Sequence, residues 1–111
     1  MTKSMMTPER KLEELGLKLP KPTKLPEGLH LPFKFVNIRG ERVLFSGHPK
    51  NALDGSIAGP FGVFGSDLTT EQGYNEAREV ALSVLANIKS EIGELSRIIG
   101  WARVFGMVNS A

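Results

Sequence analysis

The sequence has 111 residues, of which 41% are hydrophobic, so it is long enough for one compact domain and too short for two ordinary domains. Its 14 basic and 12 acidic residues give a formal net charge of +2, a small excess that supports binding to nucleic acid only weakly. The chain has no cysteine, which excludes disulfides and thiolate sites, and its two histidines stand in no metal-binding motif, so we expect neither a metal nor a cofactor.

Residues 1–32 are predicted to form an N-terminal arm with one short helix, ahead of an α+β domain over residues 33–111. Thr7 can cap the helix, and Pro8 and Glu9 are both favoured in a first helical turn. Closely spaced prolines then disfavour regular structure in the rest of the arm. The arm lacks the apolar core of a secretory signal, and no part of the sequence approaches the roughly 18 apolar residues of a membrane span. We therefore expect a cytoplasmic protein that does not enter a membrane.

The first predicted element of the folded domain is a β-hairpin. Residues 33–37 and 42–46 are rich in strand-forming side chains, and residues 39–41 provide a turn between them. Glycine, proline, asparagine and aspartate are frequent over residues 47–65, which predicts a loop with a short third strand at residues 61–64. The glycines of this loop do not have the spacing of a phosphate-binding motif.

A long helix is predicted after the loop. Thr69 and Gln72 have the spacing of a capping box, and Gly93 marks the end of the helix. Apolar residues between these limits recur at spacings of three and four, so they share one face of the helix. We expect this face to lie across the sheet. Its members are Tyr74, Ala77, Ala81, Val84, Leu85, Ile88 and Ile92.

Residues 97–108 predict a long strand that is apolar on both faces. One face carries small side chains such as Gly100 and Ala102, and the other carries larger ones such as Trp101 and Phe105. A strand of this kind belongs inside a sheet that is covered on both sides. We therefore expect a second subunit to cover the outer face, although the spacing of Trp101 and Phe105 also suits the stacking of nucleobases.

Several short segments fit the pattern of one known family. Residues 44–48 end a predicted strand in Ser-Gly, residues 62–65 read Gly-Val-Phe-Gly, and residues 67–78 read DLTTEQGYNEAR. The final residues 105–111 read FGMVNSA, and residues 11–20 are similar to the opening of a longer-chain branch. In these segments the sequence resembles the RidA/YjgF family of reactive-intermediate deaminases, which is also described as the L-PSP endoribonuclease family.

The resemblance implies a chorismate-mutase-like βαββαβ sheet with helices on one face, of which these 111 residues contain only the first half clearly. It also implies a homotrimer with ligand clefts between neighbouring subunits. Members of the family hydrolyse reactive enamines and imines to ketoacids and ammonia, and others are described as endoribonucleases or translation inhibitors. We therefore expect a small imine or ketoacid-like ligand.

The resemblance also implies a substrate-binding cleft that includes Phe33, Ser46 and Gly47. Phe33 stands where the family has a tyrosine and lacks its hydroxyl, and His48 stands where the family usually has glutamine. The family's carboxylate-binding arginine and water-orienting glutamate lie beyond the last residue, so we expect a chain truncated within the fold. Arg103 is the candidate replacement, because a guanidinium can hold a carboxylate through two parallel hydrogen bonds.

Each candidate residue also has a purely structural interpretation. Arg103 can pair with acidic side chains at an interface, while Ser46 and Gly47 can simply end a strand. His48 can act as a general base, since imidazole titrates near neutrality, or lie unused on a loop surface. Catalytic residues are therefore not assigned from the sequence. Three hypotheses stay open, namely imine hydrolysis, a non-catalytic trimeric module that binds a ligand or partner, and RNA cleavage or translation inhibition.

Overall fold

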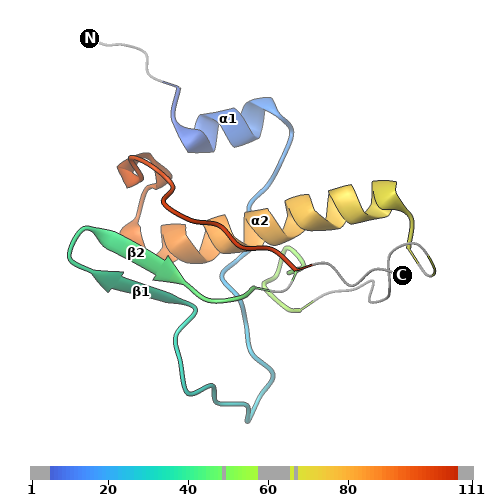
Figure 1. The fold of residues 1–111 in the computed structure, drawn as a ribbon, viewed down its shortest axis with the longest axis horizontal. Helices are drawn as coiled ribbons and strands as arrows, with labels where there is room; N and C mark the ends of the chain where they lie inside the picture. Colours follow the sequence, from blue (N-terminus) through green and yellow to red (C-terminus); the bar gives the residue numbers. More distant parts are fainter. Residues whose placement is uncertain (1–5, 49, 58–65, 67, 108–111) are drawn as a thin grey trace.

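The computed structural model describes residues 6–48, 50–57, 66 and 68–107. These residues form an α+β structure with a two-stranded antiparallel sheet, which confirms the predicted class (Figure 1). The complete βαββαβ arrangement stays a prediction, because only two strands pair among the described residues. None of the helices in this part of the chain has the length and apolar character needed to cross a membrane. The elements are α1 (Pro8–Glu14), β1 (Val36–Arg39), β2 (Arg42–Phe45), α2 (Thr70–Ile92) and the 3-10 turn η1 (Leu95–Arg97).

The hairpin register decides which side chains face the core. Val36 lies opposite Phe45 and Ile38 lies opposite Val43, so all four side chains share one face of the sheet. The prediction for the first strand was wrong, because β1 covers residues 36–39 and not 33–37. The backbone pairing of the hairpin ends at Phe35, whose carbonyl oxygen accepts a hydrogen bond from the Ser46 N–H at 2.9 Å. Residues 33 and 34 lie before this last bond and therefore do not belong to the strand.

Helix α2 begins and ends as the sequence predicts. The Thr69 hydroxyl accepts a hydrogen bond from the Gln72 N–H at 3.1 Å, and the Gln72 side chain accepts one from the Thr69 N–H at 2.8 Å. Gly93 ends the helix with a φ of 91°, a backbone conformation that glycine adopts without steric penalty. The capping box and the glycine stop are therefore both confirmed.

The predicted apolar face of α2 is buried only in its second half. Of its predicted members only Ile88 and Ile92 are buried, whereas Tyr74 is 73% exposed and Ala77 is also exposed. Leu82 and Ala86 are buried as well, although neither was among the predicted residues. The first turns of α2 extend beyond the hairpin, so the sheet cannot cover them (Figure 1). Helical periodicity identifies a face, but the length of the opposing sheet decides how much of that face is covered.

The hydrophobic core lies between the hairpin and the second half of α2. Its fully packed members are Val36, Ile88, Ile92 and Leu95. Burial of each such side chain stabilises the fold by about 1.5 to 3 kcal/mol before conformational entropy is subtracted. The short turn η1 follows α2 directly and returns Leu95 to the core, where only 1% of the residue is exposed. Partly buried side chains complete the cluster: Leu12, Leu19, Phe35, Val43, Phe45, Val84, Leu85 and Ile98.

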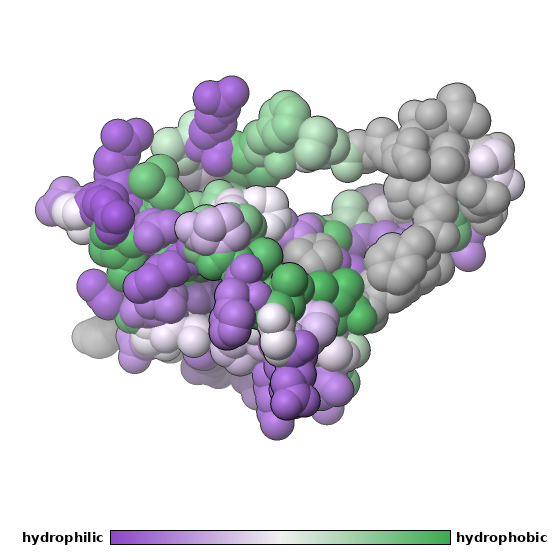
Figure 2. Space-filling model, turned by 90° about the horizontal axis from the view of Figure 1, so that it is seen from below, coloured by the Kyte–Doolittle hydropathy of each residue, from purple (hydrophilic) through white to green (hydrophobic). Residues whose placement is uncertain are grey.

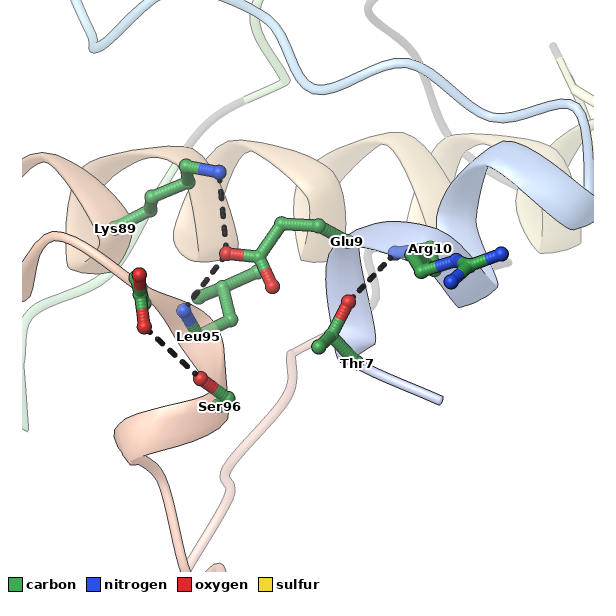
Figure 3. Close-up of polar contacts among 7 residues, drawn as sticks. Thr7, Glu9, Arg10, Lys89, Leu95 and Ser96 are labelled. Atoms are coloured by element: carbon green, nitrogen blue, oxygen red, sulfur yellow. Dashed lines mark hydrogen bonds and ion pairs between the residues drawn. The ribbon is translucent and has the colours of Figure 1, made fainter. Parts of the chain in front are cut away.

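The N-terminal helix α1 is attached to this core mainly through one carboxylate. Glu9 accepts hydrogen bonds from the Lys89 ammonium at 3.1 Å and from the Leu95 N–H at 2.9 Å (Figure 3). The bond from Leu95 is the main reason why the pKa of Glu9 is lowered; Lys89 acts in the same direction, and partial burial opposes both. Thr7 caps α1 by accepting a hydrogen bond from the Arg10 N–H, as predicted. The division of the chain at residues 32 and 33 stays a prediction.

The later part of the arm is attached through a polar network against α2. The Thr23 N–H donates to Asn87 Oδ1 at 2.8 Å, and Asn87 Nδ2 donates to the Thr23 hydroxyl at 2.7 Å. Asn51 joins the same hydroxyl from the loop, and its N–H donates to the hydroxyl of Ser83 at 3.0 Å. Gly55 lies so close to the arm that a Cβ there would clash with the carbonyl oxygen of Pro22. Arm, loop and α2 are thus held together by polar contacts.

The predicted strand over residues 97–108 is wrong for its described part. Its first residue belongs to η1, and residues 98–107 take part in no strand of the described structure (Figure 1). The Trp101 ring lies edge-on to the Phe45 ring with centroids 6.2 Å apart, so the segment runs beside β2. Within the described residues no backbone hydrogen bond joins this segment to the hairpin, and without such a ladder there is no strand.

Large hydrophobic side chains remain on the surface. Figure 2 shows hydrophobic residues in patches among hydrophilic ones on the face seen from below. The C-terminal segment contributes several, including Ile99, Val104, Phe105 and Met107. Their exposure agrees with the expectation that a second subunit packs against this segment, but the presence of that subunit stays a prediction. The predicted strand at residues 61–64 and the family-like ending after residue 107 lie outside the described residues.

Candidate ligand site at the end of the hairpin

Ser46 and Gly47, two of the predicted site residues, directly follow β2. The Ser46 hydroxyl is only weakly engaged, at 3.5 Å from the Phe35 carbonyl oxygen and 3.4 Å from the Gly47 carbonyl oxygen. Apart from its chain neighbours, no atom of the described residues lies within 4 Å of the place where a Cβ on Gly47 would stand, and Gly47 is exposed. The backbone at Gly47 is therefore open on that side, whereas Ser46 is partly buried.

Phe33, another predicted site residue, lies shortly before β1. Its ring packs edge-on against Phe35 with centroids 6.1 Å apart, and 51% of the residue remains exposed. Phe33 and Phe35 line a pocket of about 470 Å³ between the arm, β1 and α2. Phe33 and Ser46 both contact Phe35, one through the ring and the other through the backbone carbonyl, but Ser46 and Gly47 are not among the residues that line this pocket. Arg103 is not part of it: the side chain is exposed and forms no hydrogen bond or ion pair within the described residues.

His48 occupies the centre of this region. Its ring lies 5.1 Å from the Phe35 ring and 6.2 Å from the Phe45 ring, measured between centroids. Together with Phe33 and Trp101, these residues form what we call the aromatic cluster. Nδ1 of His48 lies 2.7 Å from the Ser46 carbonyl oxygen. A carbonyl oxygen can only accept, so Nδ1 carries the hydrogen and Nε2 of the neutral ring presents a lone pair.

The Nε2 atom of His48 is buried and has no hydrogen-bond partner among the described residues. Burial lowers the pKa of His48, and the hydrogen bond to the Ser46 carbonyl opposes that effect. The ring is therefore neutral at pH 7. A buried acceptor without a partner costs about 1 to 3 kcal/mol. Because Nε2 is closed off from solvent, a ligand or water can donate to it only after the surrounding side chains move.

Comparisons with protein-family models and with curated protein sequences give no match. One solved structure is similar, a crystal structure described as "a putative endoribonuclease" from Shewanella oneidensis MR-1, with a TM-score of 0.67 and 33% sequence identity. The match covers 82% of this chain, and the chain spans 56% of the length of that protein. The chain belongs to the YjgF/L-PSP family.

The end of the hairpin in this YjgF/L-PSP chain combines polar and aromatic groups. They are the His48 imidazole, whose Nε2 has no partner among the described residues, the weakly engaged Ser46 hydroxyl, and the half-exposed rings of Phe33 and Trp101. An imidazole and a hydroxyl can both take part in hydrogen bonding and proton transfer. Within the described residues no group of three histidine or acidic side chains is placed to hold a metal ion.

Sequence reasoning on this YjgF/L-PSP chain did not predict that the His48 ring is partly buried between two phenylalanines. The residue follows Ser-Gly in a loop, so its surface interpretation was the simpler one. The signal that it is buried lies in the register, because residues 35 and 45 sit at the open end of the hairpin beside Ser46. Phenylalanine at both positions encloses a side chain that leaves β2 only three residues later.

Proposed function

We propose that this YjgF/L-PSP chain provides part of a cleft that hydrolyses small enamines or imines to a ketoacid and ammonia. The observation that supports this most is the unpartnered Nε2 of neutral His48 beside Ser46. In imine hydrolysis, water attacks the carbon of the C=N bond and loses a proton as the C–O bond forms. A neutral imidazole that is held in place by its other nitrogen can accept that proton.

The same proton is needed in the second half of the reaction. After addition of water, the carbon carries one hydroxyl and one amino group, and the amino nitrogen must be protonated before it leaves as ammonia. The imine therefore enters with its nitrogen protonated. His48 returns the proton to the amino nitrogen, and ammonia leaves as the hydroxyl gives up its own proton to His48. Ammonia then takes up this proton, so that protonated imine plus water gives ketoacid plus ammonium. The lowered pKa of His48 favours this return, because a buried imidazolium gives up its proton more readily than an exposed one.

Binding of the substrate is assigned to the residues around His48. The Ser46 hydroxyl and the Gly47 backbone hydrogen-bond to the substrate, and the Phe33 ring packs against its carbon chain. Arg103 is proposed to hold the carboxylate, since its guanidinium forms no ion pair within the described residues and lies on the segment that runs beside β2. This assignment requires the side chain to turn toward Ser46 when substrate binds.

The completed βαββαβ sheet, the homotrimer and the cytoplasmic location are part of the same proposal. The exposed apolar side chains support a subunit interface, because Leu44 on the outer face of β2 and Phe105 on the C-terminal segment are 53% and 75% exposed. Patches of this kind commonly mark protein contacts. Sedimentation analysis tests the subunit count directly: a mass of three chains is expected, and a stable monomer would remove the trimer from the proposal.

The test is the decay of freshly generated 2-iminopropanoate with and without the protein. We expect acceleration by the wild-type protein and a loss of about 100-fold or more both for His48→Phe and for His48→Gln, because neither replacement can accept the proton. Arg103→Ala should raise KM, whereas Arg10→Ala on α1 should change nothing. Equal rates for wild type and His48→Phe in folded samples would overturn the assignment of His48. Binding of a ketoacid without any acceleration would favour the non-catalytic module.

RNA cleavage is the second candidate, supported by the description of the similar Shewanella protein and by the neutral imidazole. A base of this kind can remove the proton of a ribose 2′-hydroxyl. Incubation with single-stranded RNA should then release fragments from wild type and not from His48→Phe, and binding should weaken steeply with salt because phosphate contacts release counterions. Intact RNA after incubation with a folded sample would remove this candidate.

A further inference from the structure

His48 lies between two phenylalanine rings that the hairpin holds in place. Its ring centroid is 5.1 Å from that of Phe35 and 6.2 Å from that of Phe45. Phe45 belongs to β2, and the Phe35 carbonyl oxygen accepts a hydrogen bond from the Ser46 N–H, so the backbone of both phenylalanines is fixed by the pairing. His48 follows the hairpin and belongs to no strand or helix. Its side chain can therefore rotate away without any change in the pairing of the hairpin.

The enclosed ring suits a neutral imidazole and not a charged one. Nδ1 of His48 has the Ser46 carbonyl oxygen as its partner at 2.7 Å, whereas Nε2 is buried and has no partner among the described residues. A second proton would go to Nε2, where the new N–H would find no acceptor in this part of the chain. A buried charge that lacks a hydrogen bond or a counter-charge is strongly disfavoured. Protonation therefore favours a ring outside the cluster, where water can solvate both N–H groups.

The charged side chains on the surrounding elements do not offset that cost. The cations among the described residues are Lys34 beside Phe35, Arg39 and Arg42 in the strands, Lys50 two residues after His48, and Arg103 on the C-terminal segment. Lys50 is paired with the Glu76 carboxylate at 3.1 Å, and the Glu41 carboxylate lies in the turn at the other end of the hairpin. None of these groups shifts the pKa of His48, which burial lowers and the hydrogen bond to the Ser46 carbonyl raises.

We propose that His48 is a proton-operated plug of the hairpin end, which lies between Phe35 and Phe45 when it is neutral and moves out into solvent when it takes up a proton. The movement opens the aromatic cluster below the ordinary imidazole pKa of 6.5, because burial lowers the pKa of this ring. Histidines act as pH sensors in this range. The switch is independent of imine hydrolysis, since it needs only the ring, its two neighbours and a proton.

The test is an NMR titration between pH 7.5 and pH 5, in which nuclear Overhauser effects from the His48 ring to the two phenylalanine rings report where the imidazole lies. These effects are expected at pH 7.5. They should disappear over the same pH range in which the nitrogen signals of His48 show that it takes up the proton. Far-UV circular dichroism should stay constant over this range, because α2 takes no part in the movement.

Trp101 provides a second readout, because it is the single tryptophan of the chain and its ring lies edge-on to Phe45. Its fluorescence should change over the same pH range in the wild-type protein. The change should persist in His30→Gln, the matched control, which removes the other of the two histidines and affects an exposed residue. It should be absent in His48→Gln, which cannot take up the proton.

Four results would overturn the proposal. The first is a His48 ring that takes up a proton and keeps its contacts to both phenylalanines. The second is a ring that stays neutral down to pH 5 in a folded sample. The third is the same fluorescence change in His48→Gln as in the wild-type protein. The fourth is loss of the helical signal together with the ring contacts, which would mean that the whole fold opens and not the plug alone.

Discussion

The hydrophobic core and the aromatic cluster lie next to each other at the open end of the hairpin, yet they are built differently. The core around Ile88 and Leu95 buries aliphatic side chains that need no polar partner. The aromatic cluster buries an imidazole nitrogen and leaves it without a partner among the described residues. The difference shows which region is suited to hold the fold and which to receive a ligand. Substitutions in the two regions should therefore have opposite consequences.

The largest expected effect is on stability, from the core. Leu95→Ala should lower the free energy of unfolding by about 2 to 5 kcal/mol, because a side chain at 1% exposure leaves a cavity when it is shortened. Ile99→Ala, four residues later and fully exposed, should change it by less than about 0.5 kcal/mol. Urea unfolding measures both. Similar losses for the two variants would mean that residues 98–107 are packed in solution.

A smaller effect should come from the contact that attaches α1. Glu9→Gln should lower the free energy of unfolding by about 1 kcal/mol at pH 7, because charged acceptors make stronger hydrogen bonds than neutral ones. The pKa of Glu9 is lowered by folding, so its contribution is complete above its ordinary value of 4.5 and is lost as the pH falls through the folded-state pKa.

Unfolding measured between pH 7 and pH 3 should therefore show a smaller loss of stability on acidification for Glu9→Gln than for wild type. Glu14→Gln is the matched control, because its pair with Lys11 is about half exposed and contributes little. Parallel pH profiles for wild type and Glu9→Gln would show that the bonds of Glu9 are not kept in solution.

The smallest effect, of opposite sign, should come from His48. His48→Phe should leave the free energy of unfolding unchanged or raise it by about 1 kcal/mol, because it removes a buried acceptor that has no partner within the described residues. Folding lowers the pKa of His48, so the wild-type protein loses stability as the pH falls below the ordinary value of 6.5, and the variant should lack this loss. A marked destabilisation at pH 7 would mean that Nε2 has a structural partner in solution.

The sequence predicted best what depends on neighbouring residues. The capping box of Thr69 and Gln72 and the turn at Gly40 follow from local chemistry, and both are present. The strand at residues 97–108 was wrong in its described part, because a strand also needs a partner edge that alternation cannot guarantee. The burial of His48 Nε2 without a hydrogen-bond partner among the described residues was not predictable, since it depends on the rings of Phe35 and Phe45, which the hairpin brings together.

The measurement that tests the central claim most directly is the nitrogen NMR spectrum of His48 at pH 7, with and without lactate. The lactate hydroxyl imitates the one formed when water adds to an imine carbon. The account predicts a neutral ring with hydrogen on Nδ1, an unprotonated Nε2, and an Nε2 signal that moves with lactate while Nδ1 stays bonded. A ring that is protonated at pH 7, or an Nε2 signal that ignores lactate, would contradict the role assigned to His48.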